Sequence, residues 1–229
     1  MPKAIKKRVA KKPLTTEEDV KQRLSTLKNT FRQRQKIVLL VTAGMLAILI
    51  AFAGFMIYSH NLQKKARMLE YGAYKIFHNQ AQNDSGERYQ KAMDMFRKAY
   101  DTKKSPISLY YVAACNYELG KYDDALKTLG EFVKRYPDAE KFLPLVYRKM
   151  ATVYIRRGDT NGAMKALESL YNLKGQIYED FALMEYGRIL EKSGNPEDAK
   201  KKYKELTTRF PDSPFFSEAR AKLSDEKEG

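Results

Sequence analysis

An uninterrupted apolar stretch, IVLLVTAGMLAILIAFAGFMIY, occupies residues Ile37 to Tyr58. It contains 22 residues and no charged side chain. As a helix that rises about 1.5 Å per residue it would span roughly 33 Å, close to the thickness of the hydrocarbon core of a bilayer. The stretch therefore predicts a single N-terminal transmembrane helix at residues 37–58, with a short segment before it and a long polar region after it.

The segment before this span is strongly basic. Its 36 residues carry 12 Lys and Arg side chains against three acidic ones. Basic residues close to a span stay in the cytoplasm because their transfer across the bilayer is costly. Fewer basic residues follow the span closely (Lys64, Lys65 and Arg67). We therefore expect a cytoplasmic N-terminus and a C-terminal domain on the opposite side of the membrane.

A cleaved signal peptide is the main alternative to an anchor. The tripeptide Ala51-Phe52-Ala53 matches a small-residue cleavage pattern. The apolar run nevertheless continues to Tyr58, and the region before it is much longer than the basic region of an ordinary signal peptide. We expect an uncleaved anchor, and whether this site is ever cleaved stays open at the level of sequence.

The N-terminal segment divides into two parts. Residues 1–15 are basic with few apolar positions, which predicts a disordered cytoplasmic tail. Thr15 and Glu18 resemble a capping box, so an amphipathic juxtamembrane helix is expected over residues 16–36. Two interpretations of the basic residues remain open. They only orient the span, or they also contact anionic lipid, ribosomal RNA or an acidic partner. Sequence-specific binding of a nucleic acid is not expected. The apolar face of this helix would comprise Val20, Leu24, Leu27 and Phe31.

After the span the sequence repeats itself. Three segments, Leu109–Asp138, Tyr147–Gly175 and Leu183–Asp212, each show two apolar helical runs separated by a glycine-containing turn. A degenerate earlier copy has a first helix near residues 66–77, a loop from Asn79 to Arg88 and a second helix after it. Small residues should let the paired helices approach closely, and the turn glycines should supply positive φ. The alanines that mark the register are 33, 38 and 36 residues apart, at Ala92, Ala125, Ala163 and Ala199.

This pattern resembles the tetratricopeptide repeat, whose period is about 34 residues. The resemblance implies an all-α fold in which a transmembrane helix precedes a tetratricopeptide-repeat-like α-solenoid over residues 59–224. A last helix opened by Pro214 would cap the stack. Residues 225–229 should form a disordered tail. Cys115, the single cysteine, falls on an apolar helix and should be a buried structural thiol.

No catalytic constellation can be identified. His60 and His78 have no neighbouring His or Cys at ligand spacing, so neither a metal nor another cofactor is expected, and we predict no enzyme. What remains is a surface for binding protein. In such a stack the first helices line a concave groove, and Tyr and Arg suit partner binding there. The expected groove residues are Tyr110, Ala114, Tyr117, Glu118, Arg148, Thr152, Ile155, Arg156, Met184, Arg188, Glu191 and Lys192.

The order of parts, together with Ser59-His60 and the basic junction after the span, resembles the YfgM-type ancillary subunits of the bacterial Sec translocon. That resemblance implies a single-pass bacterial inner-membrane protein with a periplasmic repeat domain that binds translocon subunits, secreted clients or periplasmic chaperones. The ending FPDSPFFSEARAKL equally resembles terminal repeats of other envelope proteins. A structural or assembly subunit of another envelope complex, for secretion, motility or division, and a cytoplasm-facing anchored regulator therefore remain as alternatives.

Overall fold

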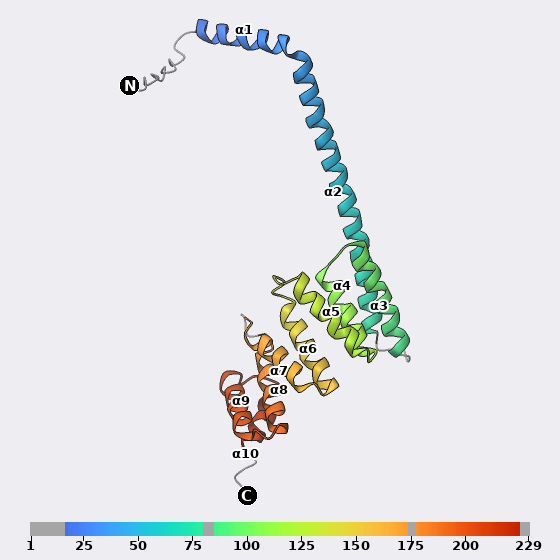
Figure 1. The fold of residues 1–229 in the computed structure, drawn as a ribbon, viewed down its shortest axis with the longest axis vertical. Coiled ribbons are helices and arrows are strands. Elements are labelled where there is room, and N and C mark those ends of the chain that lie inside the picture. Colours follow the sequence, from blue (N-terminus) through green and yellow to red (C-terminus); the bar gives the residue numbers. More distant parts are fainter. Residues whose placement is uncertain (1–16, 80–84, 174–176, 225–229) are drawn as a thin grey trace, which may run out of the picture. The chain divides into compact units, whose positions relative to one another are not determined.

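The computed structural model describes residues 17–79, 85–173 and 177–224, and the regular structure in those ranges is entirely α-helical (Figure 1). The chain divides into two units, residues 1–59 and 60–229. The tails expected at residues 1–15 and 225–229, and the Thr15 half of the capping box, lie outside the described residues.

The first unit holds helix α1 (Glu17–Gln33) and the beginning of helix α2 (Gln35–His78), which are separated by a turn at Arg34. The predicted apolar face of α1 is solvent-exposed at Val20, Leu24 and Leu27. The apolar stretch of residues 37–58 lies within α2, and its side chains are exposed except for a half-buried Val38. Among the described helices, α2 is the one that is long and apolar enough to cross a membrane.

Helix α2 is longer than the sequence suggested. A separate helix was expected near residues 66–77, but α2 is continuous over 44 residues and includes that segment. The linking residues Ser59–Lys65 contain no glycine or proline, and Leu, Gln and Lys are good helix formers, so nothing ends the helix there. The loop expected from Asn79 to Arg88 is also shorter, because the next helix already begins at Ser85.

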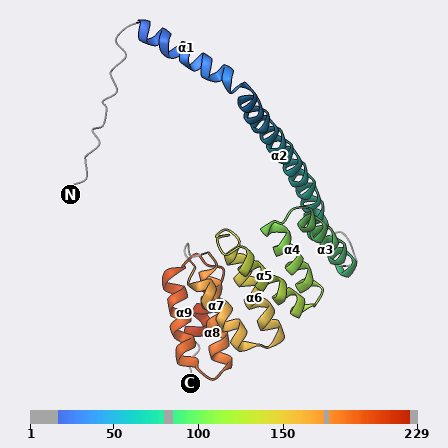
Figure 2. The ribbon, with the colours of Figure 1, turned by 45° about the horizontal axis from the view of Figure 1, so that its top comes forward.

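In the second unit the C-terminal part of α2 pairs with α3, helices α4 to α9 form three further consecutive pairs, and α10 follows the last pair (Figures 1 and 2). Each helix from α3 onward packs mainly on its neighbours in the chain, and α4 also contacts α6, as in a solenoid. The eight helices are α3 (Ser85–Thr102), α4 (Pro106–Glu118), α5 (Tyr122–Arg135), α6 (Leu143–Arg157), α7 (Thr160–Tyr171), α8 (Glu179–Lys192), α9 (Pro196–Arg209) and α10 (Phe216–Ser224).

Helix starts and turns follow from identifiable residues. The Ser105 hydroxyl accepts a hydrogen bond from the Ser108 backbone N–H and Pro106 occupies the first turn of α4, while Asp159 caps α7 through the Gly162 N–H at 2.8 Å. The turns inside the three clear pairs place glycine in the left-handed region, as expected from the sequence. The φ angles are 72° at Gly120, 73° at Gly158 and 77° at Gly194.

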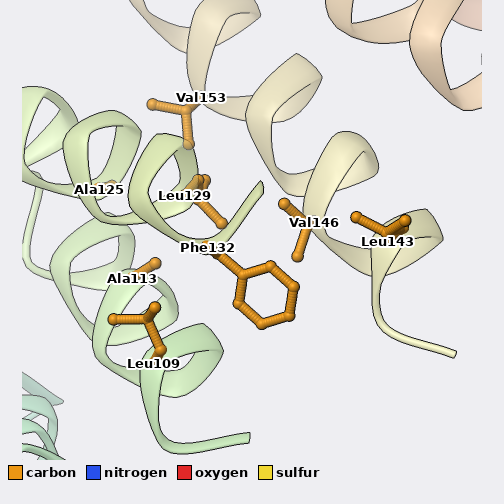
Figure 3. Packing of buried hydrophobic residues seen from close by; sticks show 8 residues of the cluster. All are labelled: Leu109, Ala113, Ala125, Leu129, Phe132, Leu143, Val146 and Val153. Carbon is orange, nitrogen blue, oxygen red and sulfur yellow. The ribbon is translucent and has the colours of Figure 1, made fainter. Parts of the chain in front are cut away.

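The core is a series of clusters between successive helices rather than one central mass. The four register alanines are all buried, and so is Cys115, as expected. Figure 3 shows the cluster that joins α4, α5 and α6, where the ring of Phe132 lies between Leu109 and Val146. Phe132 is completely buried, and removing a buried aromatic ring of this kind typically costs about 3–5 kcal/mol.

Candidate functional site

A hollow of about 180 Å³ lies between α4 and α6, the first helices of two consecutive pairs. Tyr110 and Tyr117 are seven residues apart on α4, and Arg148 and Thr152 are four residues apart on α6, so each pair shares one helix face. The hollow thus brings together four of the residues predicted for the groove. Its complete lining, called the α4/α6 hollow below, is Tyr110, Tyr117, Leu145, Arg148, Lys149 and Thr152.

The two cations of the α4/α6 hollow rest on aromatic rings. The Lys149 ammonium lies 4.5 Å from the centroid of the Tyr117 ring. The Arg148 guanidinium carbon lies 4.6 Å from the Tyr178 centroid and 5.0 Å from that of Phe181. Rings at such distances attract a cation through their negative faces and also fix its position.

The backbone at Tyr178 is strained. Its φ of 63° makes it the one non-glycine residue with a positive φ in the part of the chain that the structure describes. Such a conformation costs about 1–3 kcal/mol and is kept only where the surroundings compensate for it. Tyr178 immediately precedes α8, and its ring contacts the Arg148 guanidinium. The strain therefore accompanies the placement of an aromatic ring beside this cation.

Burial changes the acid–base properties of the hollow. It lowers the pKa of the Lys149 ammonium, an effect that the nearby carboxylate of Glu118 partly opposes. Burial also raises the pKa of the Tyr110 hydroxyl, with a further contribution from Tyr178. The pKa of Arg156 is raised by the hydroxyl of Tyr117. Burial therefore favours the neutral form of both the Lys149 amine and the Tyr110 phenol.

The remaining predicted groove residues on α4 and α6 lie at the edge of this hollow or beneath the surface. Glu118 and Arg156 are exposed. Ile155 is half-buried and packs against the hydrophobic cluster formed by α6, α7 and α8. Ala114 is only 3% exposed and cannot contribute much contact area.

Three predicted groove residues on α8, Met184, Arg188 and Glu191, need correction or reinterpretation. Met184 was expected in the groove, but it is completely buried in the cluster that joins α8 to α9 and α10. The prediction was wrong because α10 packs against the same end of the stack and adds Ala219 to that cluster. Met184 is therefore a core residue.

Arg188 and Glu191 are engaged by α10. The Arg188 guanidinium donates to Glu218 at 2.6 Å, and the Lys222 ammonium donates to Glu191 at 2.9 Å. Glu191 also accepts from the Tyr203 hydroxyl at 3.1 Å. These contacts occupy the polar face of α8, so Arg188 and Glu191 hold the last helix; Lys192 is exposed beside them.

The sequence did not single out four residues of this site. Leu145 lies three positions before Arg148 and could have been found from helical spacing, and Lys149 adjoins Arg148 on the flank of α6. Tyr178 immediately precedes α8 and Phe181 lies in its first turn, and both come before Leu183, where the repeat recognised in the sequence begins. Among the described residues, no group of three or more His, Cys, Asp or Glu side chains could hold a metal ion.

The fold is that of a helical-repeat protein that binds other proteins. Its helices are paired, its turns contain glycine, its register alanines are buried, and the face between its first helices is open. The chain belongs to the family described as tetratricopeptide repeat-like domain, whose model matches residues 33–223. This match indicates a module for binding other proteins and no catalytic family. The chain therefore carries a protein-interaction scaffold, as the repeats in its sequence suggested.

Comparison with individual proteins gives more distant likenesses. The heat shock protein sti1 homolog of Schizosaccharomyces pombe is 26% identical over 168 residues, which cover 59% of this chain and 28% of that protein. The chain thus spans little more than a quarter of the length of this curated relative. Among solved structures, MamA MSR-1 C2 is 15% identical with a TM-score of 0.49, covering 70% of this chain and 82% of the other. A thermophilic TPR protein of Thermus thermophilus is 18% identical with a TM-score of 0.46, covering 71% and 80%.

Proposed function

We propose that this protein is a membrane-anchored scaffold whose repeat domain binds segments of other proteins in the α4/α6 hollow. The observation that carries the proposal is the lining of that hollow: two tyrosines, a leucine and two cations on adjacent first helices. Tyr and Arg combine apolar area with hydrogen-bonding capacity and are enriched at the centres of protein interfaces. An extended or helical segment would lie across α4 and α6.

Anchoring is supported by the exposed apolar side chains of α2 between residues 37 and 58. Exposing the apolar surface of these 22 uncharged residues to water would be unfavourable, and the same surface is suited to lipid. The excess of basic residues before this stretch supports a cytoplasmic N-terminus and a periplasmic repeat domain in a bacterial inner membrane. A periplasm-only reporter fused after Gly229 tests this orientation: silence in intact cells would favour the cytoplasm-facing regulator instead.

Helix α1 supports a contact with anionic lipid at the cytoplasmic surface. Val20, Leu24 and Leu27 are exposed on a helix that also carries Lys21, Arg23, Lys28 and Arg32. Such helices lie in the membrane interface with the apolar face inward and the basic residues near lipid headgroups. A peptide of residues 17–33 should bind vesicles of anionic phosphatidylglycerol and leave vesicles of zwitterionic phosphatidylcholine largely unbound at low salt.

The assignment to the Sec translocon rests on the resemblance in layout, and the alternative is another envelope complex. Crosslinking in cells followed by purification from detergent-solubilised membranes separates the two. The native protein is compared with a variant in which residues 37–58 are replaced by an unrelated span. Recovery of translocon subunits with the native span alone would support the Sec assignment. Recovery of another envelope complex, or of equal amounts of the same partners with both spans, would indicate that the repeat domain recognises the partner.

The contribution of the hollow is tested separately with Arg148→Glu, which reverses one charge of its lining. Lys127→Glu is the matched control, because Lys127 is exposed on α5 outside the hollow. Arg148→Glu should reduce recovery of crosslinked partners at least ~10-fold, as expected for an interface residue worth about 1.4 kcal/mol or more, whereas the control should not. Unchanged recovery with Arg148→Glu would exclude this surface.

A further inference from the structure

Helix α2 exposes apolar side chains in the first helix pair of the solenoid. Met68 is 74% exposed and Tyr71 is 62% exposed, and their spacing of three residues places them on one side of the helix. Among the described residues of the repeat domain, the other exposed large apolar side chains are Tyr74 of the same helix and Ile177. Exposed apolar residues that lie together indicate an interaction surface.

The C-terminal part of α2 can be aligned with α4, the next first helix. Each of the two helices has one completely buried alanine and, four residues later, an aromatic ring that contacts a tyrosine of its partner helix. The ring centroids of these contacts lie 5.3 Å apart in the first pair and 5.8 Å apart in the second. Positions of α2 therefore correspond to positions of α4 that are 40 residues later. The matched residues are Ala73 and Ala113, Phe77 and Tyr117, and, on the partner helices, Tyr89 and Tyr122.

This alignment shows what covers the same face in the second pair. Ser108 and Cys115 of α4 are completely buried, and the Ser108 hydroxyl donates to Glu70 of α2 at 2.6 Å. The ring of Tyr111 stacks on Phe96 of α3, with centroids 4.7 Å apart. A preceding helix pair thus covers this face of α4, whereas the matching face of α2 is exposed, so a helix is the element that fits there. The matched residues are Met68 and Ser108, Tyr71 and Tyr111, and Lys75 and Cys115.

Cations flank the exposed apolar residues. Lys64, Arg67 and Lys75 lie three or four residues from Met68 or Tyr71, on the same side of α2, and all five side chains are exposed. The Lys75 ammonium lies 4.5 Å from the centroid of the Tyr71 ring. In the described part of the chain none of the three cations forms an ion pair. Their charges are therefore available to a partner.

The nearby carboxylate is engaged elsewhere. Glu70 is the one acidic residue between Asn61 and His78. Its carboxylate accepts hydrogen bonds from the hydroxyls of Ser105 and Ser108 at 2.5 and 2.6 Å, so it belongs to the contact with α4. The exposed face of α2 thus combines an apolar centre with positive charge. A second copy would place the same cations opposite one another, and like charges across an interface are unfavourable.

We propose that this face docks an acidic amphipathic helix of another protein. Apolar residues of that helix would cover Met68 and Tyr71, and its Asp or Glu side chains would pair with the three cations. The surface is separate from the α4/α6 hollow, and the inference does not depend on the function proposed for the hollow. The surface, called the α2 end face below, comprises Lys64, Arg67, Met68, Tyr71 and Lys75.

The first test measures binding of synthetic helices to the full chain in nanodiscs of neutral phosphatidylcholine. Each peptide is about five helical turns long and carries leucine at every third or fourth position. The residues that flank the leucines are all Glu, all Gln or all Lys. Fluorescence anisotropy of the labelled peptides gives dissociation constants, and empty nanodiscs give the background. The Glu peptide should bind at least ~10-fold more tightly than the Gln peptide, and the Lys peptide most weakly. Equal binding of the three peptides would overturn the inference.

Charge reversal assigns the binding to the α2 end face. The double variant Arg67→Glu, Lys75→Glu should reverse the preference, so that the Lys peptide binds more tightly than the Glu peptide. The matched control is Lys127→Glu, Lys134→Glu, which reverses two exposed lysines of α5 and should keep the wild-type preference. Circular dichroism and the unfolding midpoint check the folding of each variant.

The variant Arg148→Glu separates this inference from the proposed function. It alters the α4/α6 hollow and should leave the preference for the Glu peptide unchanged. If Arg148→Glu abolishes binding while the reversal of Arg67 and Lys75 has no effect, the peptide binds in the hollow. That result would overturn docking on the α2 end face and leave the function proposed for the hollow intact.

The second test identifies the occupant in cells. The full chain with Tyr71→benzoylphenylalanine is irradiated, and the adducts are mapped by mass spectrometry. Adducts on a segment of another protein that is acidic and has apolar residues at helical spacing would support the inference. Adducts on phospholipid alone would assign the face to the bilayer surface, and adducts on a second copy alone would assign it to self-association. Either of these results, or the absence of any adduct, would overturn the proposal.

Discussion

Residues without a bulky side chain set how closely the helices of this solenoid approach one another. Gly187 on α8 faces the ring of Tyr203 on α9, and a methyl group at its position would overlap that ring. Tyr203 cannot easily move away, because it is buried and its hydroxyl donates to Glu191 at 3.1 Å. The glycine is therefore required by packing, even though glycine in a helix is intrinsically unfavourable.

We predict that Gly187→Ala lowers the free energy of unfolding by about 1–3 kcal/mol, the usual cost of overpacking a core. Gly130→Ala is the matched control, because Gly130 is also helical but has nothing within 4 Å of an added methyl group. That substitution should stabilise the protein by about 0.5–1 kcal/mol through helix propensity. Urea unfolding followed by circular dichroism measures both, and equal effects of the two substitutions would contradict the packing argument.

The buried thiol of Cys115 makes stability depend on alkaline pH. Burial, together with the negative charge of Glu118, raises its pKa from 9.0 to about 12. Above pH 9 the unfolded thiol loses its proton while the folded thiol keeps it, so the folded state binds more protons. The stabilisation from this group is fully present below pH 9 and is lost as the pH rises toward 12.

The wild type and Cys115→Ala should therefore differ in the slope of unfolding free energy against pH between about 9 and 11. The unfolding free energy of the wild type should fall more steeply with pH. The buried tyrosines contribute to this pH dependence in both proteins, whereas the thiol contributes in the wild type alone. The free energies come from urea titrations at each pH. Parallel curves would show that the thiol is not shielded in the folded state.

At the scale of elements, α10 closes the end of the stack. Ala219 is completely buried against α8 and α9, and Glu218 and Lys222 form ion pairs with Arg188 and Glu191. These pairs are partly exposed and contribute little individually, so the apolar contact of Ala219 is the more important one. Without it, the core around Tyr203 would be open to water.

Ala219→Asp should destabilise the protein by about 2–4 kcal/mol, because it places a charge without a partner in an apolar contact. Ala221→Asp, at an exposed position of the same helix, should change stability by less than about 0.5 kcal/mol. The dye ANS should fluoresce more strongly with the first variant alone, since uncovered core binds it. A similar response from both variants would mean that α10 does not act as a cap.

Much of the element pattern could be predicted from the sequence, because each pair carries its own local signals. Gly120, Gly158 and Gly194 mark turns, and the alanine register marks buried contacts. The continuity of α2 was missed because the end of the apolar stretch suggested the end of a helix. The residues that follow favour helix, so the helix continues there. The site was predicted less completely: Met184 and Arg188 depend on α10, roughly 30 residues further along the chain, and Tyr178 lies where the repeat pattern is interrupted.

At the scale of the whole repeat domain, contacts between helices are almost entirely between neighbours in the chain. The stability of such an array is approximately a sum of local terms. A destabilising substitution in one repeat therefore need not lower the local stability of distant repeats equally. The cluster around Phe132 joins α4, α5 and α6, whereas Leu206 belongs to the cluster that joins α8, α9 and α10. The two residues therefore probe different parts of one solenoid.

Phe132→Ala, at a cost of about 3–5 kcal/mol, should reduce hydrogen-exchange protection mainly in α4 to α6 and leave α8 and α9 comparatively protected. Leu206→Ala should give the reverse distribution. Exchange followed by mass spectrometry on the full chain reports both patterns. Uniform loss of protection in either variant would indicate one cooperative unit instead of a graded array.

The glycine turns carry a consequence for how this chain can be altered. In the three clear pairs the register alanine follows its turn glycine by five residues: Gly120 and Ala125, Gly158 and Ala163, Gly194 and Ala199. The unequal spacing of the alanines therefore arises outside the turns. Residues 103–105 connect α3 to α4 whereas the longer segment 136–142 connects α5 to α6, and α5 has 14 residues against 12 in α7. An epitope or a protease site inserted in those connections should leave the packing register of the paired helices unchanged. A single residue added inside a glycine turn should instead shift the register between the two helices of that pair.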